Sequence, residues 1–221
     1  STDNQRIPGD DELKNLVSLT DYNDLLIDKS SNRAMLKREG QMVDLGGIAK
    51  GYAADCAIEI YKKHGIKSAI INLGGNVKVL GSKPDGTPWK IGIQNPRAPI
   101  GKIVGIVEVT DKTVVSSGDY QRYFIEDSVR YHHIIDPRTG RPADSGLMGV
   151  TVITDSSIDA DALSTAAFVL GLEKGMELVE SLDGVEAVFI NVDKKIYVTD
   201  GLKGKFIFED ESKEYEYVEE R

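Results

Sequence analysis

The sequence is short of cysteine and of long apolar runs. Its single cysteine, Cys56, excludes an internal disulfide framework and a cysteine-rich metal site. No stretch holds the roughly 18 consecutive apolar residues that suggest a membrane-spanning helix. No signal peptide, lipidation motif or transit segment is recognisable. These absences leave a domain with an ordinary apolar core, in a compartment that the residues do not specify.

Basic residues are the smaller charged group. The 27 lysines and arginines are set against 36 aspartates and glutamates, which gives a net charge of -9. This balance argues against a nucleic-acid partner and favours solubility. Part of the charge is local, since residues 209–221 hold seven acidic residues against two basic ones. We predict that this acidic tail is a solvated or frayed end of the chain.

The hydrophobic pattern predicts several helices and many short strands, without internal repeats or an interior linker. Helices are expected at 10–19, 48–64, 158–170 and 173–182. Strands are expected at 25–27, 33–37, 68–73, 77–80, 89–94, 104–109, 114–115, 123–125, 129–135, 150–153, 185–191, 196–199 and 206–208. We therefore predict a single α+β domain over residues 1–221, with mixed, mostly antiparallel sheets and packed helices.

Residues 43–55 combine a short apolar lead, the pair Gly46-Gly47, Lys50 and the start of a helix. Paired glycines let the backbone bend tightly. A helix N-terminus with free N–H groups beside a lysine is suited to binding an anion such as phosphate. The spacing is not that of a P-loop. A plain strand–turn–helix junction would give the same pattern.

Apolar residues recur at helical spacing along this first long helix. They are Ile48, Tyr52, Cys56 and Ile60, with Ala53, Ala57 and Tyr61 beside them. We expect this face to be buried. Cys56 is then a small buried apolar residue.

The helix that begins near Ile158 places Asp161 and Thr165 four residues apart, on one face. The opposite, core-facing stripe is expected to hold Leu163, Ala166, Ala167 and Leu170. Phe168 and Leu172 flank the carboxylate, so its own face should be covered as well. A buried carboxylate needs a partner, and a carboxylate and a hydroxyl one turn apart offer two oxygens to Mg²⁺. An ordinary salt bridge or a backbone cap is the alternative for Asp161.

Three further features are weaker candidates for a site. His132 and His133 are neighbours on a predicted strand, so their side chains point to opposite faces and at most one can face a ligand. The stretches 72–75 (Asn-Leu-Gly-Gly) and 116–118 (Ser-Ser-Gly) can bring backbone amides near a ligand, or can simply be turns. No Gly-x-Ser-x-Gly motif is present, which argues against a serine hydrolase.

Five stretches occur in an order that resembles the ApbE family of FAD:protein FMN transferases. They are 43–52 (VDLGGIAKGY), 72–75 (NLGG), 117–120 (SGDY), 133–140 (HIIDPRTG) and 160–165 (ADALST). Five ordered motifs, within roughly residues 7–200, make the resemblance specific. The resemblance implies a single domain related to the T-fold.

The resemblance also implies a Mg²⁺-dependent reaction, in which the FMN half of FAD is transferred to a threonine or serine hydroxyl of a target flavoprotein and AMP is released. Asp161, Thr165 and the main-chain oxygen of Gly47 would then hold the metal. His133 or Asp161 would take the proton of the incoming hydroxyl. The FAD site would be lined by Asp44, Lys50, His133 and Ile134, with Asn72, Gly74, Ser117 and Gly118 as weaker candidates.

The family's N-terminal portion and its signal or lipid-anchor segment would precede Ser1. By resemblance alone, we therefore expect this chain to bind FAD weakly or not at all. We also expect an extracytoplasmic location at the periplasm or cell surface, and a membrane tether through that segment. Two alternatives stay open at this stage. One is hydrolysis of FAD to FMN and AMP in the same site, and the other is a flavin-binding module without transferase activity.

Overall fold

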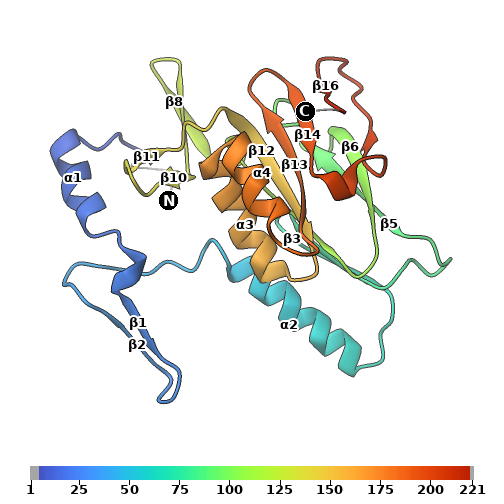
Figure 1. Cartoon of the computed structure of the whole chain (residues 1–221), viewed down its shortest axis with the longest axis horizontal. Coiled ribbons are helices and arrows are strands. Elements are labelled where there is room, and N and C mark those ends of the chain that lie inside the picture. The colour runs from blue at the N-terminus through green and yellow to red at the C-terminus, as the bar shows by residue number, and fades with distance from the viewer. Residues whose placement is uncertain (1–4, 220–221) are drawn as a thin grey trace.

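A seven-stranded sheet forms the core of the molecule in the computed structural model, which describes residues 5–219 (Figure 1). In order across the sheet, its strands are β16 (Glu216–Tyr217), β14 (Lys195–Val198), β13 (Glu186–Asn191), β12 (Leu147–Thr154), β7 (Thr113–Gly118), β4 (Asn76–Leu80) and β3 (Ala69–Leu73). Neighbouring strands are antiparallel, except that β14 and β16 run parallel.

A different layer covers each face of this sheet. On one face lie the helices α2 (Ala49–Lys63), α3 (Ser157–Leu170) and α4 (Leu172–Glu180). On the other lies a three-stranded antiparallel sheet of β5 (Trp89–Gln94), β6 (Ile103–Val109) and β15 (Ile207–Phe208). Every residue of β12 is buried, because this strand lies between both layers. Val150 and Val152 pack beneath the helices, whereas Met148 and Ile153 pack toward the second sheet.

The remaining elements lie on one side of this layered body (Figure 1). They are α1 (Asp10–Ser18), the hairpin β1 (Leu25–Asp28)–β2 (Arg33–Leu36), the hairpin β8 (Tyr123–Glu126)–β9 (Val129–His132), and the hairpin β10 (Ile135–Asp136)–β11 (Arg141–Pro142). Short 3₁₀ turns lie at Tyr22–Asp24 and Asp200–Leu202. Within residues 5–219, no helix has the length and apolar composition needed to cross a lipid bilayer.

The predicted fold class is confirmed: the sheets are mostly antiparallel and the helices pack on them. The strand expected over 129–135 is wrong at its end, because β9 stops at His132 and β10 pairs with β11 instead. The stretch 116–118 is not a turn, since it completes β7. The stretch 72–75 does form a turn between β3 and β4, in which Gly74 and Gly75 have φ angles of 61° and 96°. Glycine adopts these positive angles at no steric cost.

The buried face of α2 differs from the predicted one. Its buried residues are Gly51, Ala54 and Ile58, whereas Tyr52, Cys56 and Ile60 are exposed. The predicted burial of Cys56 is therefore wrong. The cause is the small size of Gly51 and Ala54: α2 turns its least bulky side toward the rest of the fold, and a hydrophobicity pattern does not detect such a face.

The predicted burial of α3 is right for Asp161 and Ala167 and wrong for Leu170. The residues buried along this helix are Ser157, Ala160, Asp161, Ser164, Ala167 and Phe168. Asp161 therefore lies on the core-facing side, and Leu170 of the predicted core stripe is exposed. Four of these six residues are small or hydroxylated, and close packing against β7 and α2 selects them over leucine.

The acidic tail is anchored as far as the described residues extend. β16 adds to the edge of the main sheet beside β14. Tyr215 is buried, and its hydroxyl donates a hydrogen bond of 2.9 Å to Oδ1 of Asn95. The expectation of a frayed end is thus wrong for residues 209–219. Most of their acidic side chains face solvent, but Asp210 accepts hydrogen bonds from the N–H groups of Ser212, Glu214 and Tyr215 and so helps to hold the backbone. Residues 220–221 lie outside the described part.

Candidate functional site

The candidate site lies where the N-terminal ends of α2 and α3 meet. Gly51 of α2 makes this close approach possible, because a Cβ at that position would lie 2.2 Å from the carbonyl oxygen of Ser157 and 2.6 Å from Cα of Ile158. A contact of that length with backbone cannot be relieved by a rotamer change. The glycine at position 51 therefore brings the first turn of α2 against α3.

Asp161 fills the junction between these two helices. Its side chain is almost fully buried, and Oδ2 accepts a hydrogen bond of 2.9 Å from the N–H of Gly51. The other oxygen, Oδ1, lies 3.6 Å from Nζ of Lys50. Asp161 thus receives one of the free N–H groups at the positive end of α2. Both alternatives weighed for this carboxylate from the sequence, a salt bridge and a backbone cap, are present.

The carbonyl oxygen of Gly47 is left uncommitted by this arrangement. Gly47 precedes the helix cap Ile48, and the N–H of Gly51, one of the free donors of the first turn, bonds to Asp161 rather than to the Gly47 carbonyl four residues earlier. Among the described residues, no hydrogen bond reaches the Gly47 oxygen. Gly47 itself is exposed, and a Cβ there would meet nothing within 4 Å. This oxygen is therefore available to a ligand beside the buried carboxylate.

Thr165 and Ser117 extend the polar site along α3. Oγ1 of Thr165 lies 3.0 Å from Oγ of Ser117, which also lies 2.9 Å from Oγ of Ser164. Ser117 thus projects from β7 toward the helices, on the face where Asp161 and Thr165 lie. The structure brings these three predicted residues together, although they come from two elements of the fold.

The oxygens of this site fit a hard divalent cation. A carboxylate, a hydroxyl and a free carbonyl are the donor types that Mg²⁺ binds, and Mg²⁺ commonly completes its coordination with substrate phosphates and water. Residues 5–219 contain no group of three or more His, Cys, Asp or Glu side chains placed to hold a metal. A metal here would therefore depend on Asp161 and on neutral oxygens, which suits a cation that shares its ligands with an anionic substrate.

His133 lies at the bend after β9 and is exposed, whereas its neighbour His132 is buried. The predicted opposite orientation of the two rings is confirmed. Nδ1 of His133 lies 3.3 Å from the carbonyl oxygen of Arg122, so Nδ1 carries the proton and Nε2 is free to accept one. Partial desolvation of its ring lowers the pKa of His133, the hydrogen bond to the Arg122 carbonyl raises it, and the positive charges of Arg122 and Lys50 lower it, so the net shift is downward. Its imidazole is thus kept neutral at neutral pH.

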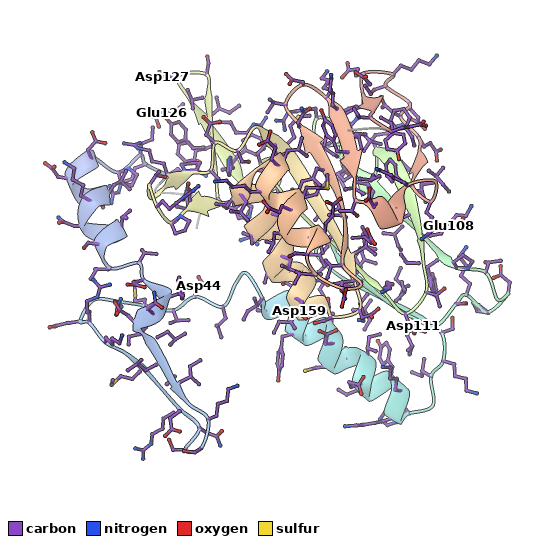
Figure 2. All side chains as sticks on the ribbon, in the orientation of Figure 1. Asp44, Glu108, Asp111, Glu126, Asp127 and Asp159 are labelled. Carbon is purple, nitrogen blue, oxygen red and sulfur yellow. The ribbon has the colours of Figure 1, made fainter. Side chains whose placement is uncertain are left out.

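Three predicted FAD-site residues have clear structural roles. The Ile134 side chain is buried beneath the helices, and its N–H donates to Nδ1 of His132. Gly118 is required by packing, because a Cβ would lie 2.3 Å from the ring of Tyr120. Asp44 lies on the segment that leads into α2 (Figure 2), where Oδ1 accepts a 2.6 Å hydrogen bond from the N–H of Gly46. Asp44 therefore shapes the glycine turn directly before the site.

Asn72 and Gly74 line a separate cavity of about 800 Å³. It lies beside Val114 and Ser116 of β7, whose side chains face away from α3, so the cavity opens on the opposite face of that strand from Ser117. Sequence reasoning missed its charged lining, which is Arg97, Arg122 and Arg130. The sequence offers no periodic signal for such a group, since the three arginines come from separate loops and β9. Of the eleven predicted site residues, Asn72 and Gly74 therefore line a cavity on the opposite face of β7 from Ser117.

The fold and sequence match known proteins over most of the chain. The ApbE family model matches residues 1–189. A curated relative from Treponema pallidum (strain Nichols), named FAD:protein FMN transferase, is 38% identical over 213 residues, which cover 90% of this chain and 59% of the relative. One of the same name from Klebsiella pneumoniae (strain 342) is 35% identical and covers 90% and 61%. The chain thus spans about six-tenths of the length of these relatives.

Solved structures agree. The crystal structure of the ApbE protein from Thermotoga maritima superimposes with a TM-score of 0.85 at 36% identity, over 93% of this chain and 66% of that one. The apo form of the flavinyl transferase ApbE from Pseudomonas stutzeri gives a TM-score of 0.78 at 37% identity, over 92% and 63%. Together with the family model that matches residues 1–189, these likenesses show that the chain belongs to the ApbE family.

Proposed function

We propose that this chain carries the metal and pyrophosphate site of a Mg²⁺-dependent FAD:protein FMN transferase. The observation that carries the proposal is the junction of α2 and α3. There a buried carboxylate, Asp161, meets a helix N-terminus, Lys50 and the free carbonyl of Gly47. Such a site pairs fixed positive charge with hard oxygen ligands, as binding of a metal-bound pyrophosphate requires. The names of the relatives support the activity and the flavin substrate.

Asp161, Thr165 and the Gly47 carbonyl would hold Mg²⁺. Bound there, the ion would neutralise the pyrophosphate of FAD and stabilise the negative charge that develops on AMP as it leaves. Lys50 and the N-terminus of α2 add positive charge on the same side of the site. The hydrogen bond from Gly51 to Oδ2 fixes the orientation of Asp161, and its other oxygen, Oδ1, lies 3.6 Å from Nζ of Lys50.

His133 is the proposed general base. Its Nε2 has no partner among the described residues, and its lowered pKa keeps this atom unprotonated near neutral pH. A neutral imidazole at an exposed bend can take the proton from the acceptor hydroxyl as that oxygen attacks phosphorus. The acceptor oxygen thereby forms a bond to the phosphorus of the FMN half of FAD. The pyrophosphate bond that joins this phosphorus to AMP breaks, and AMP leaves.

The proposal is tested by incubating the chain with FAD and Mg²⁺, with and without a candidate flavoprotein domain that carries an acceptor threonine. We expect AMP release that requires Mg²⁺ and the domain, together with covalent flavin fluorescence on the domain after denaturing electrophoresis. A threonine-to-valine variant of the domain is the matched control. AMP release without any acceptor would support FAD hydrolysis instead, and FAD binding without AMP release would support a flavin-binding module.

The location outside the cytoplasm and the membrane tether are proposed on the resemblance alone. Fractionation of cells that produce the natural protein would test both. Recovery of the protein in the cytosolic fraction would contradict them without affecting the proposed reaction.

A further inference from the structure

Asp55 lies one helical turn after Gly51 and faces the first turn of α3. Its Oδ1 and Oδ2 lie 3.1 and 2.9 Å from the N of Ser157, and Oδ2 also accepts a 3.0 Å hydrogen bond from the N–H of Ile158. These N–H groups belong to the start of α3, where a helix has no backbone acceptors of its own. A side chain of α2 therefore caps α3.

Lys78 of β4 forms an ion pair with the carboxylate of Asp55. Only 6% of Lys78 is exposed, and its Nζ lies 3.4 Å from Oδ1 of Asp55. The same ammonium donates a hydrogen bond to the carbonyl of Asp155, just before α3. A buried lysine is retained only where its charge is paired and its N–H groups are bonded. Lys78 thus ties β4 to both helices at the point where they cross.

The capping is reciprocal. Asp55 of α2 receives the N–H groups that begin α3, and Asp161 of α3 receives the N–H of Gly51 in the first turn of α2. The two carboxylates therefore define the separation and the relative rotation of the two helices. A shift of α3 would move Asp161 away from Gly47 and Lys50, which belong to the other side of the site.

We propose that Asp55 and Lys78 are positioning residues for the Mg²⁺ site. Asp55 holds the first turn of α3 on α2, Lys78 neutralises and orients Asp55, and the pair thereby sets the distance between Asp161 and the Gly47 carbonyl. Neither residue contacts the reacting groups. The inference rests on the proposed function, because it concerns metal binding by the same site.

A residue that only stabilises the fold would change the unfolding midpoint and leave the metal affinity alone. A positioning residue changes the metal affinity of the folded protein. Partners that orient metal ligands typically contribute about 10–100-fold to metal affinity. The decisive measurement is therefore the dissociation constant for Mn²⁺, which replaces Mg²⁺ and can be followed by the electron paramagnetic resonance signal of the free ion.

The experiment compares the wild-type chain with Asp55→Asn, Lys78→Met and the control Lys112→Met. Lys112 pairs with Oδ1 of Asp155 at 2.7 Å, next to the same helix start, but it bonds to neither helix. Thermal unfolding, Mn²⁺ affinity and the Mg²⁺ concentration for half-maximal AMP release are measured for each. We expect D55N to weaken Mn²⁺ binding and raise the Mg²⁺ requirement about tenfold or more, K78M to do so by about threefold or more, and K112M to stay within about twofold of wild type.

Three outcomes separate the inference from the proposed function. D55N and K78M that fold and bind Mn²⁺ as tightly as wild type would overturn the inference alone. An equal loss of Mn²⁺ affinity in K112M would also overturn it. Removal of any nearby positive charge would then be enough to weaken metal binding, without a role for the Asp55–Lys78 pair. A wild-type chain that shows neither Mn²⁺ binding nor Mg²⁺-dependent AMP release from FAD would overturn the proposed function and the inference with it. If D55N fails to fold, K78M decides, because it leaves the carboxylate cap in place.

Discussion

Gly51 and Asp161 are 110 positions apart in the sequence, yet the N–H of the first lies 2.9 Å from the carboxylate of the second, in a buried junction. The glycine serves two purposes there. It supplies the donor that orients the carboxylate, and it lacks the Cβ that would separate the two helices. One position thus determines both the packing of α2 on α3 and the orientation of a proposed metal ligand.

Gly51→Ala should destabilise the protein even though alanine is the better helix former. The substitution gains about 1 kcal/mol of helix propensity, but the new Cβ would overlap the backbone of Ser157, and this contact can be relieved only by moving a helix. We expect a net loss of about 2 kcal/mol in the free energy of unfolding, together with weaker Mn²⁺ binding. Urea unfolding measures the first effect. Gly47→Ala is the matched control, because its Cβ meets open space and its carbonyl remains.

Asp161→Asn and Asp161→Ala should separate the charge of this residue from its capping role. Asparagine retains an oxygen that can accept from Gly51, so we expect the unfolding free energy to stay within about 1 kcal/mol of wild type. Alanine leaves that N–H buried and unpaired, which costs about 1–3 kcal/mol. Both variants should lose Mg²⁺-dependent AMP release and flavin transfer. Flavinylation at the wild-type rate by D161N would contradict the metal assignment.

The sequence predicted the period of the helices but not the side that each buries. Cys56 and Tyr52 follow the helical repeat, yet they are exposed, because contact between α2 and α3 favours Gly51 and Ala54. Small residues carry little hydrophobic signal and still permit the closest approach of two backbones. On α3 the predicted core stripe is right at Ala167, which is buried, and wrong at Leu170, which is exposed.

The site was predictable to the extent that its residues lie close together in sequence. Asp161 and Thr165 are one helical turn apart, and spacing alone placed them on one face. Asp55 and Lys78 were not found, because their roles depend on long-range contacts with the start of α3. At the start of α3, the N–H groups of Ser157 and Ile158 have no acceptor in their own helix. This lack is the signal that could have prompted a search for a capping side chain elsewhere in the sequence.

Arg97 should contribute to stability through its pairing with Asp119. Two nitrogens of the guanidinium donate to the two carboxylate oxygens at 2.7 and 2.6 Å, and Asp119 is buried. The carboxylate raises the pKa of Arg97. Within residues 5–219, Arg97→Met would leave the Asp119 carboxylate with Arg130 as its remaining ion-pair partner, whose Nε lies 4.0 Å away. We expect a loss of about 3 kcal/mol in the free energy of unfolding.

A double-mutant cycle with Asp119→Leu checks this prediction. If the pair interacts as the geometry indicates, the double variant should be more stable than the sum of the two single losses predicts. Arg97→Lys keeps the charge but loses the two-pronged contact, so it should fall between wild type and R97M. Additive losses would show that the contact contributes little.

The stability of the protein should fall as the pH drops below about 6.5, partly through His132. Burial lowers the pKa of this histidine from its ordinary value of 6.5. Two hydrogen bonds define its neutral form: Nε2 donates to the carbonyl of Ala143, and Nδ1 accepts from the N–H of Ile134. Protonation at Nδ1 would point the new N–H of the ring at the N–H of Ile134, so this hydrogen bond would be lost. Asp119 favours the charged form, whereas Arg130 opposes it, and burial outweighs both.

The sign of this effect follows from proton uptake. Between the lowered pKa of the folded state and the ordinary pKa of the unfolded state, the unfolded chain binds more protons, so the free energy of unfolding decreases as the pH falls. The contribution is fully present above pH 6.5. His133 has a lowered pKa as well and adds in the same direction. Urea unfolding of wild type, His132→Gln and His133→Gln between pH 7.5 and 5 measures the slopes. We expect H132Q to be less stable at pH 7.5 and to have a shallower slope, and a slope that persists unchanged in H132Q would assign the effect to other groups.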